Sequence, residues 1–316
     1  MEHDFTYEKK IVERDIENVL GQEDIKKQLK SAILMRRHTI IVGPPGIGKT
    51  TLVKNLSELL PQKEVIGENG VETKDPVFVR VQGSPDLTAE DLLGDIDPIK
   101  ALKFGPLSLE AFTPGKIFKA DGGILFFDEV NRCSEKLQNA LLQALEERKV
   151  TIGSYDVDLD ANFIFIGTMN PEELSTEPLS DVFLDRFDLI YMHPPENQET
   201  EEKIVLLRGK KIVEFPQELL SQTIHFIRLL RISEDLEKHP SVRASIGIYE
   251  RAQSNAFLTG RTSVELKDIQ EAMVSVLGHR IRLKPSLKYI KNSTEYVREQ
   301  FSEFCEDYKG TKGGSP

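Results

Sequence analysis

Residues 43 to 50 read Gly-Pro-Pro-Gly-Ile-Gly-Lys-Thr, a loop with the spacing G-x-x-x-x-G-K-[ST]. It follows the apolar run 39–42 and precedes a helical pattern at 52–56, which is the strand–loop–helix context that the motif needs. Glycines let backbone N–H groups surround phosphate oxygens, and the following helix adds the positive end of its dipole. Lys49 would reach the β- and γ-phosphates of ATP, and Thr50 would hold Mg²⁺. The predicted nucleotide-binding residues are Gly43, Pro44, Pro45, Gly46, Ile47, Gly48, Lys49, Thr50 and Thr51.

An acidic pair, Asp128-Glu129, ends the continuous apolar run 124–127. Such a run suits a strand that is buried in a parallel sheet. Asp128 at its end can orient the Mg²⁺ shell, whereas Glu129 points elsewhere and can polarise water for attack on the γ-phosphate. The pair alone would be an acidic turn; the phosphate loop upstream makes it a predicted catalytic feature.

Three more polar residues are candidates for the same site. Asn170 follows the predicted strand 162–167, and open α/β sheets bind ligands at the carboxyl ends of their strands. Asn170 is therefore placed to hold the attacking water or a γ-phosphate oxygen. Arg186 precedes Phe187, and Arg243 stands at the start of a predicted helix. Taken singly, each arginine is expected to be an ordinary exposed surface residue.

Strands that alternate with helices up to about residue 194 predict an α/β fold with a parallel, doubly wound sheet. After Pro194-Pro195 the sequence reads as helices only, at about 197–209, 216–231, 241–258, 265–281 and 286–306. We expect an α/β core at 1–194, a smaller helical lid domain at 195–308 and a flexible tail at 309–316.

Two segments interrupt the alternation, at about 91–118 and 149–160. The first reads as an inserted hairpin or helix, and we expect its part 104–118 to be a mobile surface insertion because of its turn signals. Its phenylalanines leave a packed connector as the alternative. The second segment alternates around a Gly-Ser turn and predicts a hairpin.

The composition narrows the class of protein. The formal net charge of −11 disfavours generic binding to nucleic acid, although the basic stretch 280–298 keeps such binding open; a solvated helix face is its simpler interpretation. No apolar run approaches the length of a membrane span, and the N-terminus lacks a signal-peptide pattern. The two cysteines lack metal-ligand spacing, as expected of a cytoplasmic protein with reduced thiols.

The chain resembles the MoxR-type AAA+ ATPases of the helix-2-insert clade and, more distantly, the AAA+ subunit of magnesium chelatase. The resemblance covers about residues 16–282, and it includes an Asn-Arg pair after the acidic residues and the two interruptions. The matching motifs, in family order, are Gly43–Thr50 (Walker A), Ile124–Glu129 (Walker B), Asn170 (sensor 1), Arg186 (arginine finger) and Arg243 (sensor 2).

The resemblance implies roles for these residues. Arg186 would reach the ATP of a neighbouring subunit, and Arg243 would contact the γ-phosphate from the lid, either in its own subunit or across the interface. The predicted catalytic residues are thus Glu129, Asn170, Arg186 and Arg243, and the predicted metal ligands are Thr50 and Asp128.

The same resemblance implies a homo-oligomeric ring, usually a hexamer, that hydrolyses ATP to remodel, mature or activate client proteins. Partners with von Willebrand factor A domains are common in this group. A metal-chelatase-type ATPase subunit and a nucleic-acid motor of the same clade are the alternatives. A non-enzymatic nucleotide switch would predict a damaged Glu129, Asn170 or Arg186, and all three are intact.

Overall fold

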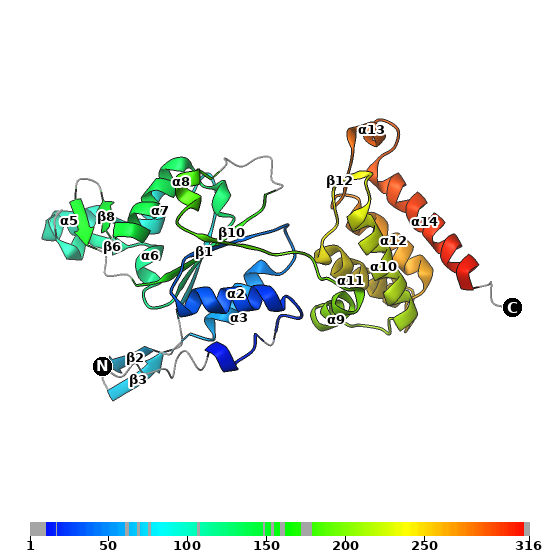
Figure 1. Ribbon diagram of the computed structural model, residues 1–316, viewed down its shortest axis with the longest axis horizontal. Helices are drawn as coiled ribbons and strands as arrows, with labels where there is room; N and C mark the ends of the chain where they lie inside the picture. Colours follow the sequence, from blue (N-terminus) through cyan, green and yellow to red (C-terminus); the bar gives the residue numbers. More distant parts are fainter. Residues whose placement is uncertain are drawn as a thin grey trace. The chain divides into compact units, whose positions relative to one another are not determined.

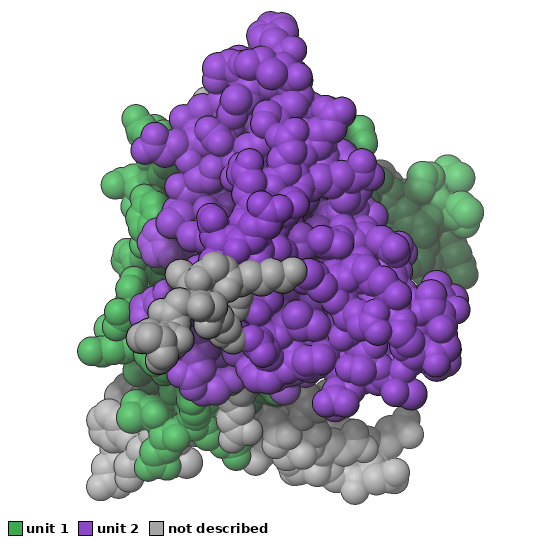
Figure 2. All heavy atoms as spheres, turned by 90° about the vertical axis from the view of Figure 1, so that its right-hand side faces the viewer, with its two compact units in different colours: residues 1–44, 48–192 green, residues 45–47, 193–316 purple. Residues whose placement is uncertain are grey.

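The computed structural model describes residues 11–16, 18–60, 63–67, 70–74, 77–105, 108–147, 149–152, 155–158, 162–171 and 179–312. The chain forms two compact units (Figures 1 and 2). The first comprises residues 1–44 and 48–192, and the second comprises residues 45–47 and 193–316. Each unit is described by itself below.

A five-stranded sheet forms the centre of the first unit (Figure 1). Every neighbouring pair in it is parallel, which confirms the predicted doubly wound α/β core. The phosphate-loop motif directly follows β1, the second strand in spatial order. It therefore lies at the carboxyl ends of the strands, where open α/β sheets bind ligands. In spatial order the strands are β11 (Asp188–Tyr191), β1 (Thr39–Val42), β10 (Ile164–Met169), β7 (Ile124–Asp128) and β4 (Phe78–Gln82).

The residue composition of each strand matches its burial in the sheet. All four residues of β1 are buried, and β7 is buried up to its final aspartate. The edge strand β4 is different, because Arg80 and Gln82 are exposed whereas Val81 is buried. Apolar runs therefore fill the central strands, and polar side chains enter the sheet at its edge.

Helices cover both faces of the sheet, with α2 and α3 on one side and α7 and α8 on the other (Figure 1). In α7 the apolar stripe packs on the sheet, with Leu137 and Leu141 in one cluster with Leu125 and Phe127 of β7. Ser134 caps this helix as its sequence predicts, since its Oγ accepts from the Leu137 N–H at 3.4 Å. The helices are α2 (Glu23–Leu34), α3 (Lys49–Ser57), α7 (Glu135–Glu147) and α8 (Asp181–Leu184).

Both interruptions of the alternation are structured. The second is the predicted hairpin, whose turn lies outside the described residues. The first pairs two short strands around a helix, and a further hairpin lies after α3. The elements are β2 (Lys63–Gly67), β3 (Gly70–Lys74), α4 (Ala89–Leu93), β5 (Gly94–Ile96), α5 (Pro98–Phe104), η1 (Leu109–Ala111), β6 (Phe112–Pro114), α6 (Lys116–Lys119), η2 (Val130–Arg132), β8 (Lys149–Ile152) and β9 (Tyr155–Asp158).

The expectation that 104–118 is surface rather than core is wrong for its second half. Ala111 and Ile117 are fully buried, and the rings of Phe112 and Phe118 pack edge to face at 5.2 Å. A Cβ on Gly115 would lie 2.4 Å from the Leu92 carbonyl oxygen, so glycine is needed for this close approach. The packed connector is the correct description here, because the turns fold the phenylalanines back onto the unit.

The second unit is mainly helical, as predicted, with one addition. Two short strands pair antiparallel, with Leu236 and Leu283 buried. The helix expected at 286–306 is divided, because Asn292 Oδ1 accepts from the N–H groups of Thr294 and Glu295 and so caps a new helix. The elements are α9 (Gln198–Arg208), α10 (Gln217–Ile232), β12 (Leu236–Lys238), α11 (Val242–Leu258), α12 (Leu266–Leu277), β13 (Arg282–Leu283), α13 (Pro285–Lys288) and α14 (Ser293–Lys312).

The last helix extends into the segment that was expected to be a flexible tail. Helix α14 reaches Lys312, and only residues 313–316 of the expected tail lie outside the described residues.

Candidate functional site

The phosphate loop joins the end of β1 to the start of α3. The Gly43 N–H donates to the Met169 carbonyl of the adjacent strand β10 at 3.1 Å, which anchors the loop to the sheet. Gly46 and Gly48 have φ values of 80° and 101°, in the left-handed region that favours glycine. Helix α3 begins directly after Gly48, so its first N–H groups face the loop. This backbone is of the kind that cradles phosphate oxygens.

Lys49 is the first residue of α3, and its ammonium group folds over the loop. Its Nζ donates to the carbonyl of Gly43 and, at 3.0 Å, to that of Pro44. The cation therefore lies along the same backbone that would cradle the phosphates.

A chain of hydroxyl and carboxylate groups connects α3 to the ends of β7 and β10. The Thr168 hydroxyl donates to Asp128 Oδ1 at 2.7 Å and accepts from the Glu129 N–H at 2.9 Å. The Thr50 hydroxyl lies 3.4 Å from Asp128 Oδ2. A hydroxyl beside a carboxylate supplies the hard oxygen donors that Mg²⁺ prefers, so this donor set fits a Mg²⁺ ion held together with nucleotide phosphates.

Glu129 has an unusual backbone conformation. Its φ is 59°, which is rare for a residue with a side chain and costs about 1–3 kcal/mol. Its carboxylate Oε2 accepts from the Gln82 amide at 2.9 Å and lies 3.2 Å from Arg132 Nη1. Behind it, the Gly83 N–H donates to the Asp128 carbonyl at 2.6 Å, and a Cβ on Gly83 would lie 2.0 Å from the Glu129 carbonyl oxygen.

Asn170 directly follows β10, next to the acidic pair. Its carbonyl oxygen accepts from the amide of the buried Asn131 at 3.4 Å. The Oδ1 atom of Asn131 is buried without a hydrogen-bond partner among the described residues. An orphaned acceptor in this position is suited to a water or a ligand group.

The two arginines contact different parts of the chain. Arg186 follows α8, where its guanidinium donates to Glu146 on α7 and to the Val182 carbonyl. The hydrogen bond to Glu146 raises the pKa of Arg186 above its ordinary value. Arg243 is an exposed residue in the first turn of α11, in the second unit, which also includes residues 45–47 of the phosphate loop. Its side chain lies against that loop, since a Cβ on Gly46 would lie 2.9 Å from Arg243 Cδ. In the first unit the structure thus groups Lys49, Thr50, Asp128 and Glu129 with the backbone of Asn170. In the second unit it places Arg243 beside Gly46.

Comparison with known proteins supports the resemblance to AAA+ ATPases. Residues 38–187 match the family described as "AAA domain (dynein-related subfamily)", and residues 229–299 match the "AAA lid domain". The Bacillus subtilis protein YeaC, itself uncharacterised, is 30% identical over 89% of this chain and 88% of its own. The chloroplastic magnesium-chelatase subunit ChlI of Glycine max is 31% identical over 90% of this chain and 78% of its own.

The chain belongs to the AAA+ ATPases. The chaperone MoxR1 of Mycobacterium tuberculosis, at 26% identity over 84% of this chain and 73% of its own, places the MoxR type among its relatives. A mutant of Thermotoga maritima RuvB shares the fold, with a TM-score of 0.51 and 19% identity over 82% of this chain and 71% of that one.

Besides Arg132, three side chains on the strands of this AAA+ site were not assigned from sequence. They are Arg80 and Gln82 on β4, which bond to the acidic pair, and Thr168 on β10, which bridges it. The signal was present, because β4 alternates apolar and polar residues up to its carboxyl end. That alternation is typical of an edge strand whose polar side chains all lie on one face. When β4 pairs with β7, the polar side chains Arg80 and Gln82 lie beside the acidic pair.

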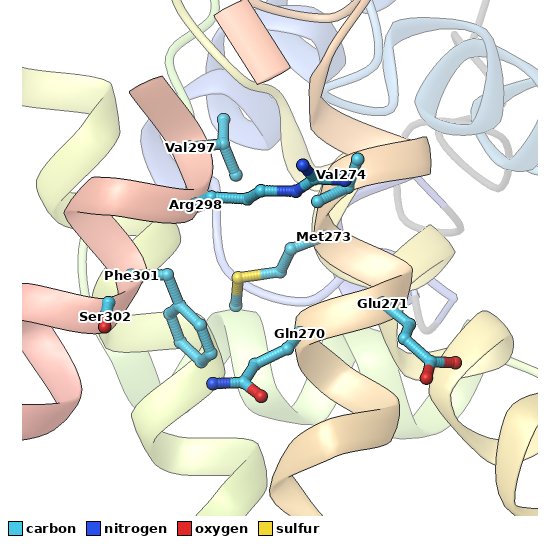
Figure 3. A pocket seen from close by; sticks show the side chains of 8 residues that line it. All are labelled: Gln270, Glu271, Met273, Val274, Val297, Arg298, Phe301 and Ser302. Carbon is cyan, nitrogen blue, oxygen red and sulfur yellow. The ribbon is translucent and has the colours of Figure 1, made fainter. Parts of the chain in front are cut away.

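The lid unit of this AAA+ protein contains a cavity of about 460 Å³ between α12 and α14 (Figure 3). Its apolar wall includes Met273, Val297 and Phe301, and Arg298 lies at its edge. The basic stretch to which Arg298 belongs is not one helix face, since it runs through β13, α13 and α14. Among the described residues, no helix combines the length and apolar character needed to span a membrane.

Proposed function

We propose that the protein hydrolyses Mg²⁺-bound ATP at the carboxyl edge of the sheet and uses that energy to remodel or mature client proteins. The observation that carries the proposal is the linked set Thr50–Asp128–Thr168–Glu129 beside the phosphate loop. Mg²⁺, when bound, would neutralise charge on the transferred phosphoryl group. Thr50 and Asp128 are the residues that would hold it.

The chain's own groups have distinct tasks in this proposal. Loop N–H groups and Lys49 bind the phosphates, and Glu129 accepts a proton from the attacking water. Asn170 orients that water or a γ-phosphate oxygen. The strained backbone of Glu129 supports its role, because strain of this kind persists where surrounding structure holds a residue in a functional position.

The proposal includes a ring, with a hexamer as the expected form, in which Arg186 of one subunit completes the site of the next. Arg186 is held by α7 and α8 rather than by its own phosphate loop, which is consistent with action on a neighbour. Arg243 would contact the γ-phosphate from the lid. The 26% identity to a protein named chaperone MoxR1 supports a chaperone-like role, and a von Willebrand factor A domain protein is the proposed client. A cytoplasmic location completes the proposal, since ATP is available there.

A chelatase-type role is the second candidate. The observation that favours it is the 31% identity to a magnesium-chelatase subunit over 90% of the chain. The net charge of −11 disfavours the third candidate, a nucleic-acid motor.

The test of the shared site is complementation between two inactive variants. Arg186→Ala should bind ATP but lose about 10³–10⁵-fold in turnover, the usual contribution of an arginine finger. Lys49→Ala should fail to bind ATP. Mixing the two should restore part of the activity, because some interfaces then join an intact pocket to an intact arginine. Wild-type activity of Arg186→Ala, or a specific activity that stays constant on dilution, would refute the shared site. A second measurement separates client remodelling from the chelatase-type role. ATP turnover is compared with candidate client proteins and with the partner subunits of a tetrapyrrole chelatase, and the set that stimulates turnover identifies the function.

A further inference from the structure

Arg80 forms an ion pair with the carboxylate that is suited to Mg²⁺. It lies on the edge strand β4, on the same face of the sheet as Phe78, whose ring stacks on that of Phe126 at 5.7 Å. Its Nη2 atom lies 2.6 Å from Asp128 Oδ2. The Asp128 side chain is only 14% exposed, whereas that of Arg80 is 51% exposed and can move away into solvent.

The geometry identifies which oxygen of Asp128 this cation covers. Oδ1 is bonded to the Thr168 hydroxyl, whereas Oδ2 is the atom that faces the Thr50 hydroxyl. Arg80 therefore bonds to the oxygen on the side where Thr50 and Asp128 would jointly hold a Mg²⁺ ion and its waters. A guanidinium and a hydrated Mg²⁺ ion both need the lone pairs of this one oxygen.

We propose that Arg80 is a positioning residue that competes with Mg²⁺ for Asp128 and so sets how strongly Mg²⁺ promotes nucleotide binding. The inference rests on the proposed Mg²⁺-dependent ATP site. Without Mg²⁺, Arg80 neutralises Asp128 and keeps its charge from repelling the nucleotide phosphates. Mg²⁺ binding must break the ion pair, so the benefit of the metal is smaller with Arg80 than without it. Loss of Arg80 therefore increases the coupling between metal and nucleotide.

The experiment measures that coupling by binding rather than by turnover. Dissociation constants of a fluorescent N-methylanthraniloyl ADP are determined with the full-length protein in EDTA and in saturating Mg²⁺. Their ratio, EDTA over Mg²⁺, should be about 3- to 10-fold higher in Arg80→Met than in wild type, the range for a charged pair with one half-exposed partner. Arg80→Lys keeps the charge and should remain closer to wild type.

Two controls isolate the contact. Arg37 bonds to Asp188 with the same shortest distance, 2.6 Å, but at the opposite, amino end of the same sheet, so Arg37→Met should leave the ratio unchanged. In an Asp128→Asn background, Arg80→Met should no longer change the ratio, since the shared carboxylate is gone. Thermal unfolding in EDTA verifies that each variant is folded.

The outcomes separate this inference from the proposed function. An unchanged ratio in Arg80→Met, an equal rise in Arg37→Met, or a rise that persists with Asp128→Asn overturns the role of Arg80 while leaving the ATP site intact. If wild type and Arg80→Met both bind the nucleotide equally well in EDTA and in Mg²⁺, the Mg²⁺-dependent site is wrong, and the inference is refuted with it.

Discussion

Replacement of the buried Glu201 by glutamine should destabilise the lid unit and disturb the start of the helix that carries Arg243. Glu201 lies on α9 with no exposed surface. Its carboxylate accepts two hydrogen bonds from Arg231, each 2.8 Å long, and one from Ser245 on α11 at 2.6 Å. Arg231 also donates to the Pro240 carbonyl just before α11. One carboxylate thus connects α9, α10 and α11.

The magnitude follows from what the substitution leaves behind. Glutamine has nearly the same shape, but its NH₂ group opposes the donors of Arg231, and the negative charge is lost. Breaking a buried ion pair by removing one partner costs about 3–5 kcal/mol. The Arg228 and Arg231 side chains keep 26% and 12% exposure, so water compensates part of the loss. We therefore expect a decrease of about 2–4 kcal/mol in the free energy of unfolding of the lid.

The same contacts give a pH dependence. Burial raises the pKa of Glu201, but hydrogen bonds and charge from Arg231, with help from Ser245 and Arg228, outweigh it and hold the pKa below its ordinary value. A group with a lowered folded-state pKa contributes stability above its unfolded pKa and loses it as the pH falls through the folded value. The stability difference between wild type and Glu201→Gln should therefore disappear in acid, below the ordinary glutamate range.

Hydrogen exchange read by mass spectrometry is the suitable assay, because the chain has no tryptophan and the effect is local to the lid. Peptides from α9, α10 and α11 should exchange faster in Glu201→Gln at pH 7. Glu199→Gln is the matched control, since Glu199 lies on the same helix in an exposed pair with Lys203, and exposed ion pairs contribute little to stability. Equal protection in Glu201→Gln and Glu199→Gln would refute the reasoning.

Three other variants test the remaining arguments. Glu129→Gln should bind ATP with near wild-type affinity but hydrolyse it about 10²–10⁴-fold more slowly, and near-normal turnover would remove Glu129 from the role of base. Gly83→Ala should lower the unfolding temperature and slow hydrolysis, because its Cβ would lie 2.0 Å from the Glu129 carbonyl oxygen; unchanged melting and turnover would contradict this close approach. Asp268→Asn should destabilise α12 by about 3 kcal/mol in chemical denaturation, since it removes a buried carboxylate that accepts two hydrogen bonds from Arg261. A loss below about 0.5 kcal/mol, the value of an exposed ion pair, would show that water compensates for the missing carboxylate.

The central sheet could be predicted because burial on both faces leaves a strong signal. Strand β1 has the predicted bounds, and β7 and β10 differ from the prediction only at their ends. The phosphate loop and the acidic pair follow these strands directly, so locating the strands also located Lys49 and Asp128. Local sequence was sufficient where the chemistry lies at the end of a regular, buried element.

Contacts between distant segments could not be predicted in this way. The bonds from Arg80 and Gln82 to the acidic pair depend on the pairing of β4 with β7, and sequence alone does not give the order of strands in a sheet. The burial of Ala111 and Ile117 depends likewise on how the insertion folds back. Turn residues mark where a chain bends, but they do not say what the bend packs against.

Each of the following charged groups of the candidate site already has a bonding partner within the protein. Lys49 bonds to loop carbonyls, Asp128 to Arg80, Glu129 to Gln82 and Arg132, and Arg186 to Glu146. Binding of Mg²⁺-ATP and assembly of a ring would have to exchange these partners for phosphate, metal and a neighbouring subunit. Because only the difference between old and new partners contributes to binding, variants of the partner residues should change affinity in either direction. Variants of the reacting groups themselves should only decrease activity, and this contrast distinguishes the two sets of residues.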